Sequence, residues 1–261
     1  MRLLFGFRRR WLGRLPQMNR PDAAVLDVGC GDGQFLAYLA SQGFRELDGV
    51  EPSQSRRQNA CVRGLRVAAS LDELDRRKFD IIFLWHVLEH VPAPMALLRE
   101  LCGRLDDRGV LVVSIPNHAG WQTRYFGSCS AYLDYGRHLW YWDSSAIDDI
   151  LKEELPGMRV REMGGRNFEY EIFGWVDTLG SRLAGKANFI HSRLKKKLGS
   201  PAGHAGALIL AGLLLPLAGI LALLLPPSAA STLTLVIERD RGDGVAADNN
   251  PRSATTWSST L

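Results

Sequence analysis

The stretch that decides the fold is V-L-D-V-G-C-G-D-G, which occupies residues Val25–Gly33. Its first half is a short apolar run that suits a buried strand, and its second half places glycines at alternate positions. Glycine is needed where the backbone turns sharply and must approach a ligand closely. The next residues, Gln34–Gln42, set their large apolar side chains on one helical face. The stretch therefore predicts a strand, a ligand-binding turn and a helix.

The same alternation of short apolar runs and amphipathic stretches continues as far as Pro116. Further strands are expected at Glu46–Val50, Leu65–Ala69, Phe79–Trp85 and Gly109–Ile115, with helices at Ser53–Arg63 and Ala93–Leu105. This alternation is typical of a parallel sheet covered by helices. Later in the chain we expect a helix at Ser145–Glu154, strands at Met158–Glu162 and Ser231–Glu238, and a long functional loop at Asn117–His138.

The carboxylates near the glycine turn indicate the charge of its ligand. A dinucleotide-binding turn needs a third glycine at the position that Gln34 occupies here. Asp27 and Asp32 would repel a pyrophosphate, but they suit a ligand that carries an ammonium or a sulfonium group. Glu51 ends the second strand, where a carboxylate can accept hydrogen bonds from two ribose hydroxyls. The pattern therefore favours a cationic nucleoside over a dinucleotide.

Four segments in order, V-L-D-V-G-C-G-D-G, G-V-E-P-S, K-F-D-I-I-F-L-W-H-V-L-E-H-V and G-V-L-V-V-S-I-P-N, resemble the class I S-adenosylmethionine-dependent methyltransferases. The most similar subgroup contains small-molecule, quinone and polysaccharide-pathway enzymes. The resemblance covers about residues 22–160 and a last strand near 232–239. It implies an α/β fold with a Rossmann-like seven-stranded sheet, and a methyl transfer that uses S-adenosyl-L-methionine as cofactor.

The resemblance also implies a set of cofactor-binding residues: Asp27, Gly29, Cys30, Gly31, Gly33, Glu51, Ser70, Leu71 and Trp85. Asp27 and the three glycines would wrap the methionine part of the cofactor, and Glu51 would hold the ribose hydroxyls. Ser70 and Leu71 would lie along the adenine. Trp85, at the end of the fourth strand, would face both the cofactor and the substrate.

Three histidines are candidates for catalysis. His86 ends the fourth strand and is expected to act as a base or to position the acceptor. His118 follows the fifth strand, where open α/β sheets bind ligands. His138 either faces the acceptor or fixes the aromatic loop around it. The spacing of His86, Glu89 and His90 would also allow a divalent metal, but we expect Glu89 and His90 to anchor the turn and no metal to bind.

Charge and cysteine usage bound the partners and the compartment. The chain has 32 Lys and Arg against 28 Asp and Glu, but residues 1–20 and 178–204 each hold six cations and no acid. The rest is acidic, which argues against nucleic acid and favours two local contacts with an anionic membrane surface. Four cysteines without paired spacing indicate reduced thiols in the cytoplasm: Cys30, Cys61, Cys102 and Cys129.

The 21 residues Ala205–Leu225 carry no charge, and Pro216 divides them into halves. Because the last strand must complete the sheet on the same side of a membrane, we expect a re-entrant or monotopic hairpin over 205–229. A true span and a buried cap or dimer contact are the alternatives. The basic run Arg193–Lys197 precedes this segment, where cations attract anionic lipid.

The N-terminal segment has a comparable pattern. Residues 1–20 form a basic amphipathic segment whose apolar stripe is Leu3, Leu4, Phe7, Trp11, Leu12 and Leu15. Such a stripe predicts an interfacial membrane helix, with a substrate-covering helix as the alternative.

The expected organisation has a catalytic domain over 21–165 and 230–240, an aromatic and basic cap over 166–204, the apolar hairpin over 205–229, and a disordered tail over 241–261.

The expected function is O-methylation of an amphipathic or lipid-linked small molecule, such as a quinone precursor or a saccharide. The enzyme would be cytoplasmic, peripheral or monotopic on the inner membrane. The alternative is a membrane-tethered cofactor-binding scaffold without turnover. The sequence does not predict the oligomeric state.

Overall fold

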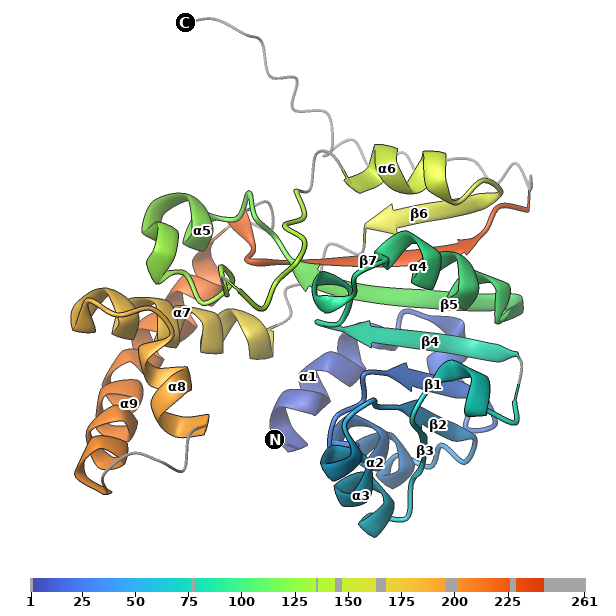
Figure 1. Cartoon of the computed structure of the whole chain (residues 1–261), viewed down its shortest axis with the longest axis horizontal. Coiled ribbons are helices and arrows are strands. Elements are labelled where there is room, and N and C mark those ends of the chain that lie inside the picture. Colours follow the sequence, from blue (N-terminus) through green and yellow to red (C-terminus); the bar gives the residue numbers. More distant parts are fainter. Residues whose placement is uncertain are drawn as a thin grey trace, which may run out of the picture.

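A computed structural model describes residues 2–76, 78–134, 136–143, 147–162, 168–195, 201–225 and 229–241. Its centre is a seven-stranded sheet with the strand order β3-β2-β1-β4-β5-β7-β6 (Figure 1). The strands are β1 (Val25–Val28), β2 (Leu47–Val50), β3 (Arg66–Ala68), β4 (Phe79–Trp85), β5 (Leu105–Pro116), β6 (Met158–Glu162) and β7 (Thr232–Arg239). The first five are parallel, and β7 lies antiparallel between β5 and β6. The predicted Rossmann-like α/β sheet is confirmed.

The strand order reverses between β1 and β4, and this reversal determines where a ligand can bind. The chain leaves β1 toward β2 on one side, whereas β4 lies on the other side with Val28 opposite Leu84. Connections that leave in opposite directions open a crevice at the carboxyl ends of the two strands. The glycine turn after Val28 and the segment after Trp85 therefore meet at the same place.

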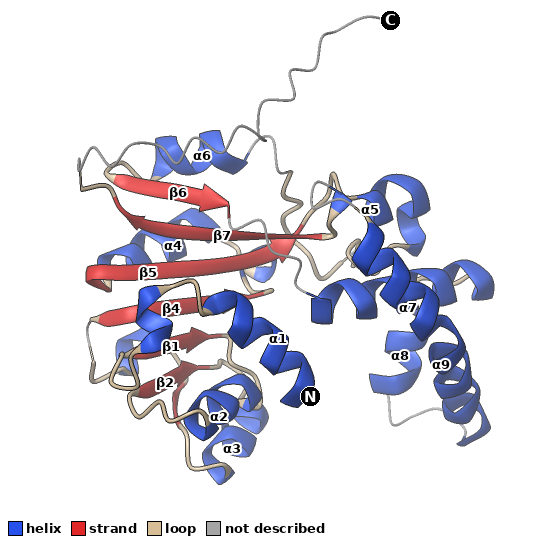
Figure 2. Cartoon of the chain, turned by 180° about the vertical axis from the view of Figure 1, so that it is seen from behind, coloured by secondary structure: helices blue, strands red, loops and turns tan. Residues whose placement is uncertain are grey.

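Helices cover both faces of the sheet. α1 (Arg2–Leu12) and α2 (Gln34–Ser41) pack on one face, whereas α4 (Pro94–Gly103) and α6 (Ile147–Glu154) cover the other (Figures 1 and 2). α3 (Gln54–Val62) connects β2 to β3. β4 is buried along most of its length because it has strands on both sides and helices above and below.

The apolar side of α1 packs on the protein itself, which corrects the prediction of an interfacial membrane helix. Phe5, Leu12 and Leu15 are buried among side chains of α2 and the sheet. Apolar side chains that already fill the core cannot also enter a bilayer, so the alternative of a covering helix is the one that the structure supports. The side chains of Leu3, Leu4 and Phe7 lie outside the described residues.

The segment predicted to be a long loop, 117–138, contains the short helix α5 (Trp121–Phe126) and a 3-10 turn (Gly127–Cys129). α5 packs on α7 (Phe168–Ala184), a helix formed by an aromatic stretch that has no clear periodicity. Buried Gln122 of α5 lies against Thr178 of α7. Because this contact joins residues far apart in the chain, no local pattern indicates it.

α7, α8 (Phe189–Lys195) and α9 (Pro201–Leu224) form a helical unit beside the sheet (Figure 1). α9 is a single continuous helix that contains Pro216, so the predicted hairpin is wrong. Proline removes one backbone hydrogen bond, at a cost of about 3 kcal/mol. Ala207, Leu214 and Ala218 lie on the side of α9 that packs on its neighbours, and this packing supports the helix on both sides of Pro216.

One helix among the described residues is long and apolar enough to cross a membrane. It is Gly203–Leu224 within α9, with a mean hydropathy of 2.7 and 17% of its most apolar window buried. Four predicted features fall partly or wholly outside the described residues: residues 145–146 of the predicted helix, Lys196 and Lys197 of the basic run, residues 226–228 of the predicted hairpin, and residues 242–261 of the tail.

Candidate functional site

The glycine turn lies at the carboxyl end of β1 and has an open side. Gly29 has φ +73°, and a Cβ there would lie 2.5 Å from a methyl carbon of Val87. Gly31 has φ +57°, and a Cβ there would meet nothing within 4 Å. Gly29 therefore lets the turn pack against the segment after β4, whereas Gly31 borders open space.

That open space is a cavity of about 260 Å³. Its lining comes from α1, β1, the glycine turn, α2, α3, β4 and α7, and consists of Phe5, Arg8, Asp27, Gly29, Cys30, Gly31, Asp32, Gln34, Phe35, Arg56, Trp85 and Tyr170. Five of the residues predicted to bind the cofactor thus lie around one cavity: Asp27, Gly29, Cys30, Gly31 and Trp85.

Asp27 is the buried acid of this cavity, with 3% of its surface exposed. Burial raises the pKa of its carboxyl to about 7; the positive charge of Arg8 opposes the shift, and the negative charge of Glu51 adds to it. A cation bound beside the carboxylate would favour the ionised form. The cavity therefore suits a ligand that brings a positive charge.

Arg8 and Tyr170 belong to the cavity but were missed by sequence reasoning. The guanidinium carbon of Arg8 lies 4.3 Å from the ring centre of Trp85 and 5.6 Å from that of Tyr170. A signal for Arg8 existed, because Phe5, Arg8, Leu12 and Leu15 follow one another at helical spacing and so share a face. Tyr170 carried no such signal, since only the folding of α7 brings it to the sheet.

The other predicted cofactor residues do not line this cavity. Both carboxylate oxygens of buried Glu51 accept backbone hydrogen bonds, from Gly31 at 3.0 Å and from Ser53 at 2.9 Å. Gly33 precedes α2, and a Cβ there would lie 2.4 Å from Leu65. Ser70 is exposed and Leu71 is partly buried at the carboxyl end of β3.

His86 has an unusual backbone conformation directly after β4. Its φ is +54°, a left-handed value that is rare for a residue with a side chain. Its Nδ1 lies 3.2 Å from Oε1 of Glu89, and its ring centre lies 4.0 Å from that of Tyr170. Its Nε2 is buried and has no hydrogen-bond partner among the described residues. The ring is therefore oriented through Nδ1, whereas Nε2 is an unpaired nitrogen inside the described part of the protein.

Glu89 is fully buried under this ring. Burial disfavours its ionised form, but the hydrogen bond and the charge of His86 outweigh that effect, so the pKa of Glu89 is lowered. Because ionised Glu89 accepts from Nδ1, a ring proton stays on that nitrogen, and Nε2 is the nitrogen that can exchange a proton.

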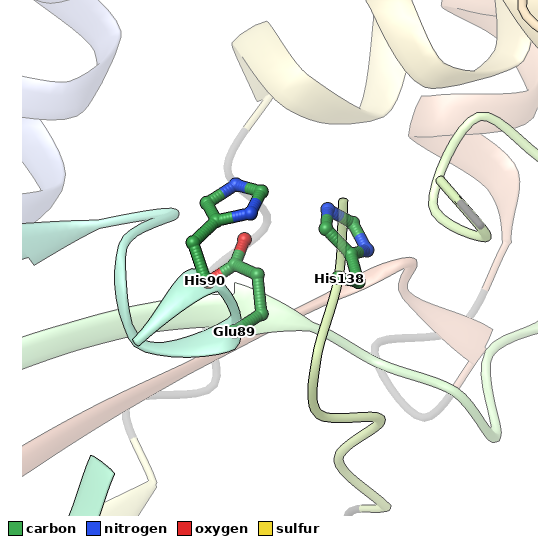
Figure 3. A group of neighbouring side chains, drawn as sticks. All are labelled: Glu89, His90 and His138. Carbon is green, nitrogen blue, oxygen red and sulfur yellow. The ribbon is translucent and has the colours of Figure 1, made fainter. Parts of the chain in front are cut away.

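Glu89 also faces His90 and His138, and the three side chains point toward one another (Figure 3). Each offers one ligand atom within 4.8 Å of the others, which is close enough for a shared cation. Nδ1 of His90 lies 2.9 Å from the carbonyl oxygen of Arg137, and Nδ1 of His138 lies 3.1 Å from that of Tyr132. The group that could hold a metal thus contains His138 in place of His86. The contact between His90 and Arg137 also anchors the loop that carries His138 to the turn that carries Glu89.

His118 has an exposed side chain, and its ring centre lies 5.4 Å from that of Tyr141. The ring centre of Tyr141 in turn lies 6.3 Å from that of His138. His138 is half-buried, and burial lowers its pKa; the charge of Glu89 opposes this shift, and the charge of His90 adds to it. A neutral His138 is compatible with a structural role or with contact to an acceptor.

A family model described as a methyltransferase domain matches residues 2–154. Among known proteins, the ubiquinone biosynthesis O-methyltransferase of Serratia proteamaculans is 36% identical over 165 residues, which are 60% of this chain and 61% of the relative. The enzyme of the same name from Rickettsia typhi is 28% identical over 196 residues, 64% of this chain and 77% of the relative. The chain therefore spans less than two thirds of the length of the Serratia protein.

Solved structures share the fold. A SAM-dependent methyltransferase from Archaeoglobus fulgidus aligns with a TM-score of 0.52 at 18% identity, over 92% of this chain and 95% of that one. Coclaurine N-methyltransferase aligns with a TM-score of 0.54 at 14% identity, over 90% of this chain and 71% of that one. At these identities the likeness extends to the architecture alone.

Proposed function

The chain belongs to the class I S-adenosylmethionine-dependent methyltransferases, and from that premise we propose that it methylates an oxygen atom of an amphipathic acceptor at a membrane surface. The acceptor would be a quinone precursor or a lipid-linked saccharide. The observation that carries the proposal is the buried carboxylate of Asp27, beside a glycine turn whose open side borders a cavity. The O-methyltransferase names of the relatives support oxygen as the atom that is methylated.

The cavity fits the cofactor by charge and by shape. Asp27 would hold the ammonium of the methionine part, and Arg8 in the same cavity would hold its carboxylate. Gly31 leaves the space that this part needs, and Trp85 would cover it. When bound, S-adenosylmethionine supplies a methyl group already activated by a sulfonium.

Glu51 would hold the ribose hydroxyls after exchanging a backbone hydrogen bond for them. Its carboxylate currently accepts from Gly31 and Ser53. Ser70 and Leu71 would border the adenine at the carboxyl end of β3. Cys30 and Gly33 would shape the turn around the methionine part.

The protein would remove the proton from the acceptor. His86 would take it on Nε2 from the acceptor hydroxyl while the methyl group becomes bonded to the same oxygen. Glu89 would stabilise the imidazolium that results, because its carboxylate lies 3.2 Å from Nδ1. His138 would position the acceptor at the edge of this site. Exposed His118 would at most contact a distant part of the acceptor.

The membrane part of the proposal rests on α9. Large apolar side chains cover its outer side, with exposed fractions from 46% to 78%: Leu208, Ile209, Leu213, Leu215, Leu217, Ile220, Leu223 and Leu224. Arg182, Lys186 and Arg193 are exposed on and between the two helices that pack beside it. Lipid would cover the apolar side, and the cations would meet anionic headgroups on the cytoplasmic face of the inner membrane.

Because α9 packs along α7, which bears charged side chains, we propose a helix that lies in the plane of the interface. A bilayer crossing would draw those charges into hydrocarbon. The enzyme would thus be monotopic.

Calorimetric titration with S-adenosylmethionine tests the cofactor site. Gly31→Arg should abolish binding because the side chain would enter the cavity. Gly64→Arg is the matched control, since Gly64 also has a positive φ and open space but lies in the turn after α3. Equal affinity in both variants would refute the proposed cofactor site. Binding without methyl transfer to any membrane extract would instead indicate a cofactor-binding scaffold.

A further inference from the structure

A second cavity, of about 560 Å³, lies between α4, α6 and the segment before α6. Its walls are mostly apolar and aromatic, and include Pro92, Met95, Trp140, Tyr141, Trp142 and Ile150. Trp140, Tyr141 and Ile150 are 42%, 41% and 38% exposed. Large apolar side chains that surround a concave space bind apolar ligands well.

The wall of this cavity is attached directly to the proposed catalytic turn. The backbone amide of Trp140 donates to the carbonyl oxygen of Glu89 at 3.3 Å, and its indole N–H donates to that of Val91 at 2.9 Å. The ring centre of Tyr141 lies 6.3 Å from that of His138. The aromatic wall is therefore held in place by the same turn that carries Glu89 and His90.

The charged residues of the lining argue against an anionic occupant. Arg99 and Glu154 both line the cavity and form an ion pair with each other, so their charges cancel. Asp143, the third charged residue of the lining, would repel an anion. What the walls offer is contact with hydrocarbon or with a flat ring.

We propose that this cavity binds the apolar arm of the methyl acceptor while the acceptor hydroxyl faces His86. The inference rests on the proposed function and adds the substrate feature that the enzyme selects. An acceptor with an alkyl or isoprenoid arm gains contacts with Trp140, Tyr141 and Ile150 that a bare hydroxylated ring does not make. The arm is held by the protein and does not remain in the bilayer beside α9.

The test compares a dihydroxybenzene with and without an octyl chain as acceptors for the full chain on anionic vesicles. We expect kcat/KM for the octyl compound to be at least about tenfold higher, because several methylenes become buried. Ile150→Glu should remove that advantage, so that the variant uses the two compounds with similar kcat/KM. Val62→Glu is the control, since Val62 is 89% exposed on α3, remote from the cavity. Partition of the octyl compound into the vesicles is the same for every variant.

The outcomes separate the inference from the proposed function. If the bare ring is methylated but the octyl advantage is absent, or survives Ile150→Glu, the inference is wrong and the proposed function stands. An advantage that survives Ile150→Glu but is lost in Leu213→Glu would place the arm in lipid at α9, which also overturns the inference. If neither compound is methylated, the proposed function fails for this acceptor class. In that case calorimetry can still detect binding of the octyl compound. If that binding is lost only in Ile150→Glu, the result supports the cavity as the site that binds the apolar arm.

Discussion

At the scale of single residues, the buried carboxyl of Asp27 is the most informative group. Its pKa of about 7 means that a modest change of pH alters its charge. Burial is the main cause, and a bound cation would reverse the effect by favouring the ionised form. The affinity of the protein for the cofactor should therefore depend on whether the carboxyl of Asp27 is ionised.

We predict that cofactor affinity rises with pH. Below a pH of about 7 Asp27 is mostly protonated and cannot pair with an ammonium, so the dissociation constant should be about tenfold larger near pH 6 than near pH 8. Calorimetry across this range measures it. Asp27→Asn should bind weakly and lose most of the dependence. A wild-type affinity that is flat between these pH values would contradict the role of Asp27.

His86 leads to a second prediction. His86→Ala should lower kcat by about 100- to 10,000-fold without changing the affinity for the cofactor, because the change removes the proton acceptor and leaves the cavity intact. Glu89→Gln should lower kcat less and shift the pH profile, since the amide cannot stabilise an imidazolium as well. Single-turnover rates across pH measure both effects.

Measurements of activity also test the alternative that a bound metal ion, and not His86, supports the reaction. If a chelator abolished activity and an added divalent cation restored it, the cation would act at Glu89, His90 and His138, and His86 would not be the base. Unchanged activity of His86→Ala would contradict the assignment directly.

At the scale of elements, α1 and α9 differ in what covers their apolar sides, although both sequences suggest a membrane contact. Both are apolar enough to meet a membrane, but α1 buries its apolar side on the sheet, whereas α9 exposes one of its own. The difference depends on which surface lies opposite each helix. Identical substitutions on the two helices should therefore have different consequences.

Leu12→Ala in α1 should lower the free energy of unfolding by about 2–5 kcal/mol, because Leu12 is fully buried. Leu213→Ala in α9 should change it by less than about 0.5 kcal/mol, because Leu213 is 73% exposed. Chemical denaturation with urea measures both. Equal effects of the two substitutions would mean that α1 is not part of the core.

The exposed side of α9 can be tested by changing its polarity. Leu213→Glu combined with Leu224→Glu should weaken binding to anionic vesicles by about tenfold or more, because two side chains that enter lipid become charged. Val62→Glu on α3 adds one of the same charges elsewhere and should have little effect. Vesicle co-sedimentation gives the affinities. A double variant that binds as tightly as the wild-type chain would refute the lipid-facing assignment.

At the scale of the whole molecule, one buried carboxylate joins the helical unit to the sheet. Glu171 of α7 accepts from the backbone amide of Ser231 at 2.6 Å and from its hydroxyl at 3.2 Å. Ser231 directly precedes β7, so this contact determines how the helical unit sits beside the catalytic sheet. Tyr170, which contacts His86, is the neighbouring residue in the same helix.

Glu171→Ala should lower the free energy of unfolding by about 2–4 kcal/mol, because it leaves a buried backbone N–H without its acceptor. Glu171→Gln keeps an acceptor oxygen and should cost less. Hydrogen exchange should show α7 and α9 opening before the sheet in Glu171→Ala. If the sheet opened first, the contact would not be what couples the two parts.

Several parts of this organisation could be predicted from local pattern. The succession of strands and helices and the glycine turn follow from short apolar runs and glycine spacing. The rule that ligands bind at the carboxyl ends of parallel strands places Asp27 and Trp85 at one cavity. The seven-stranded Rossmann-like sheet was implied by the resemblance of four segments to a known family, and the structure confirms that fold class.

Other parts depend on which distant segments pack together. Arg8 reaches Trp85, Tyr170 reaches His86, and His138 reaches Glu89 only after α1, α7 and the loop before α6 have docked. The continuity of α9 through Pro216 and the burial of α1 have the same origin. Apolar residues at helical spacing establish that a helix will bury one side, but the tertiary structure decides whether protein or lipid covers it.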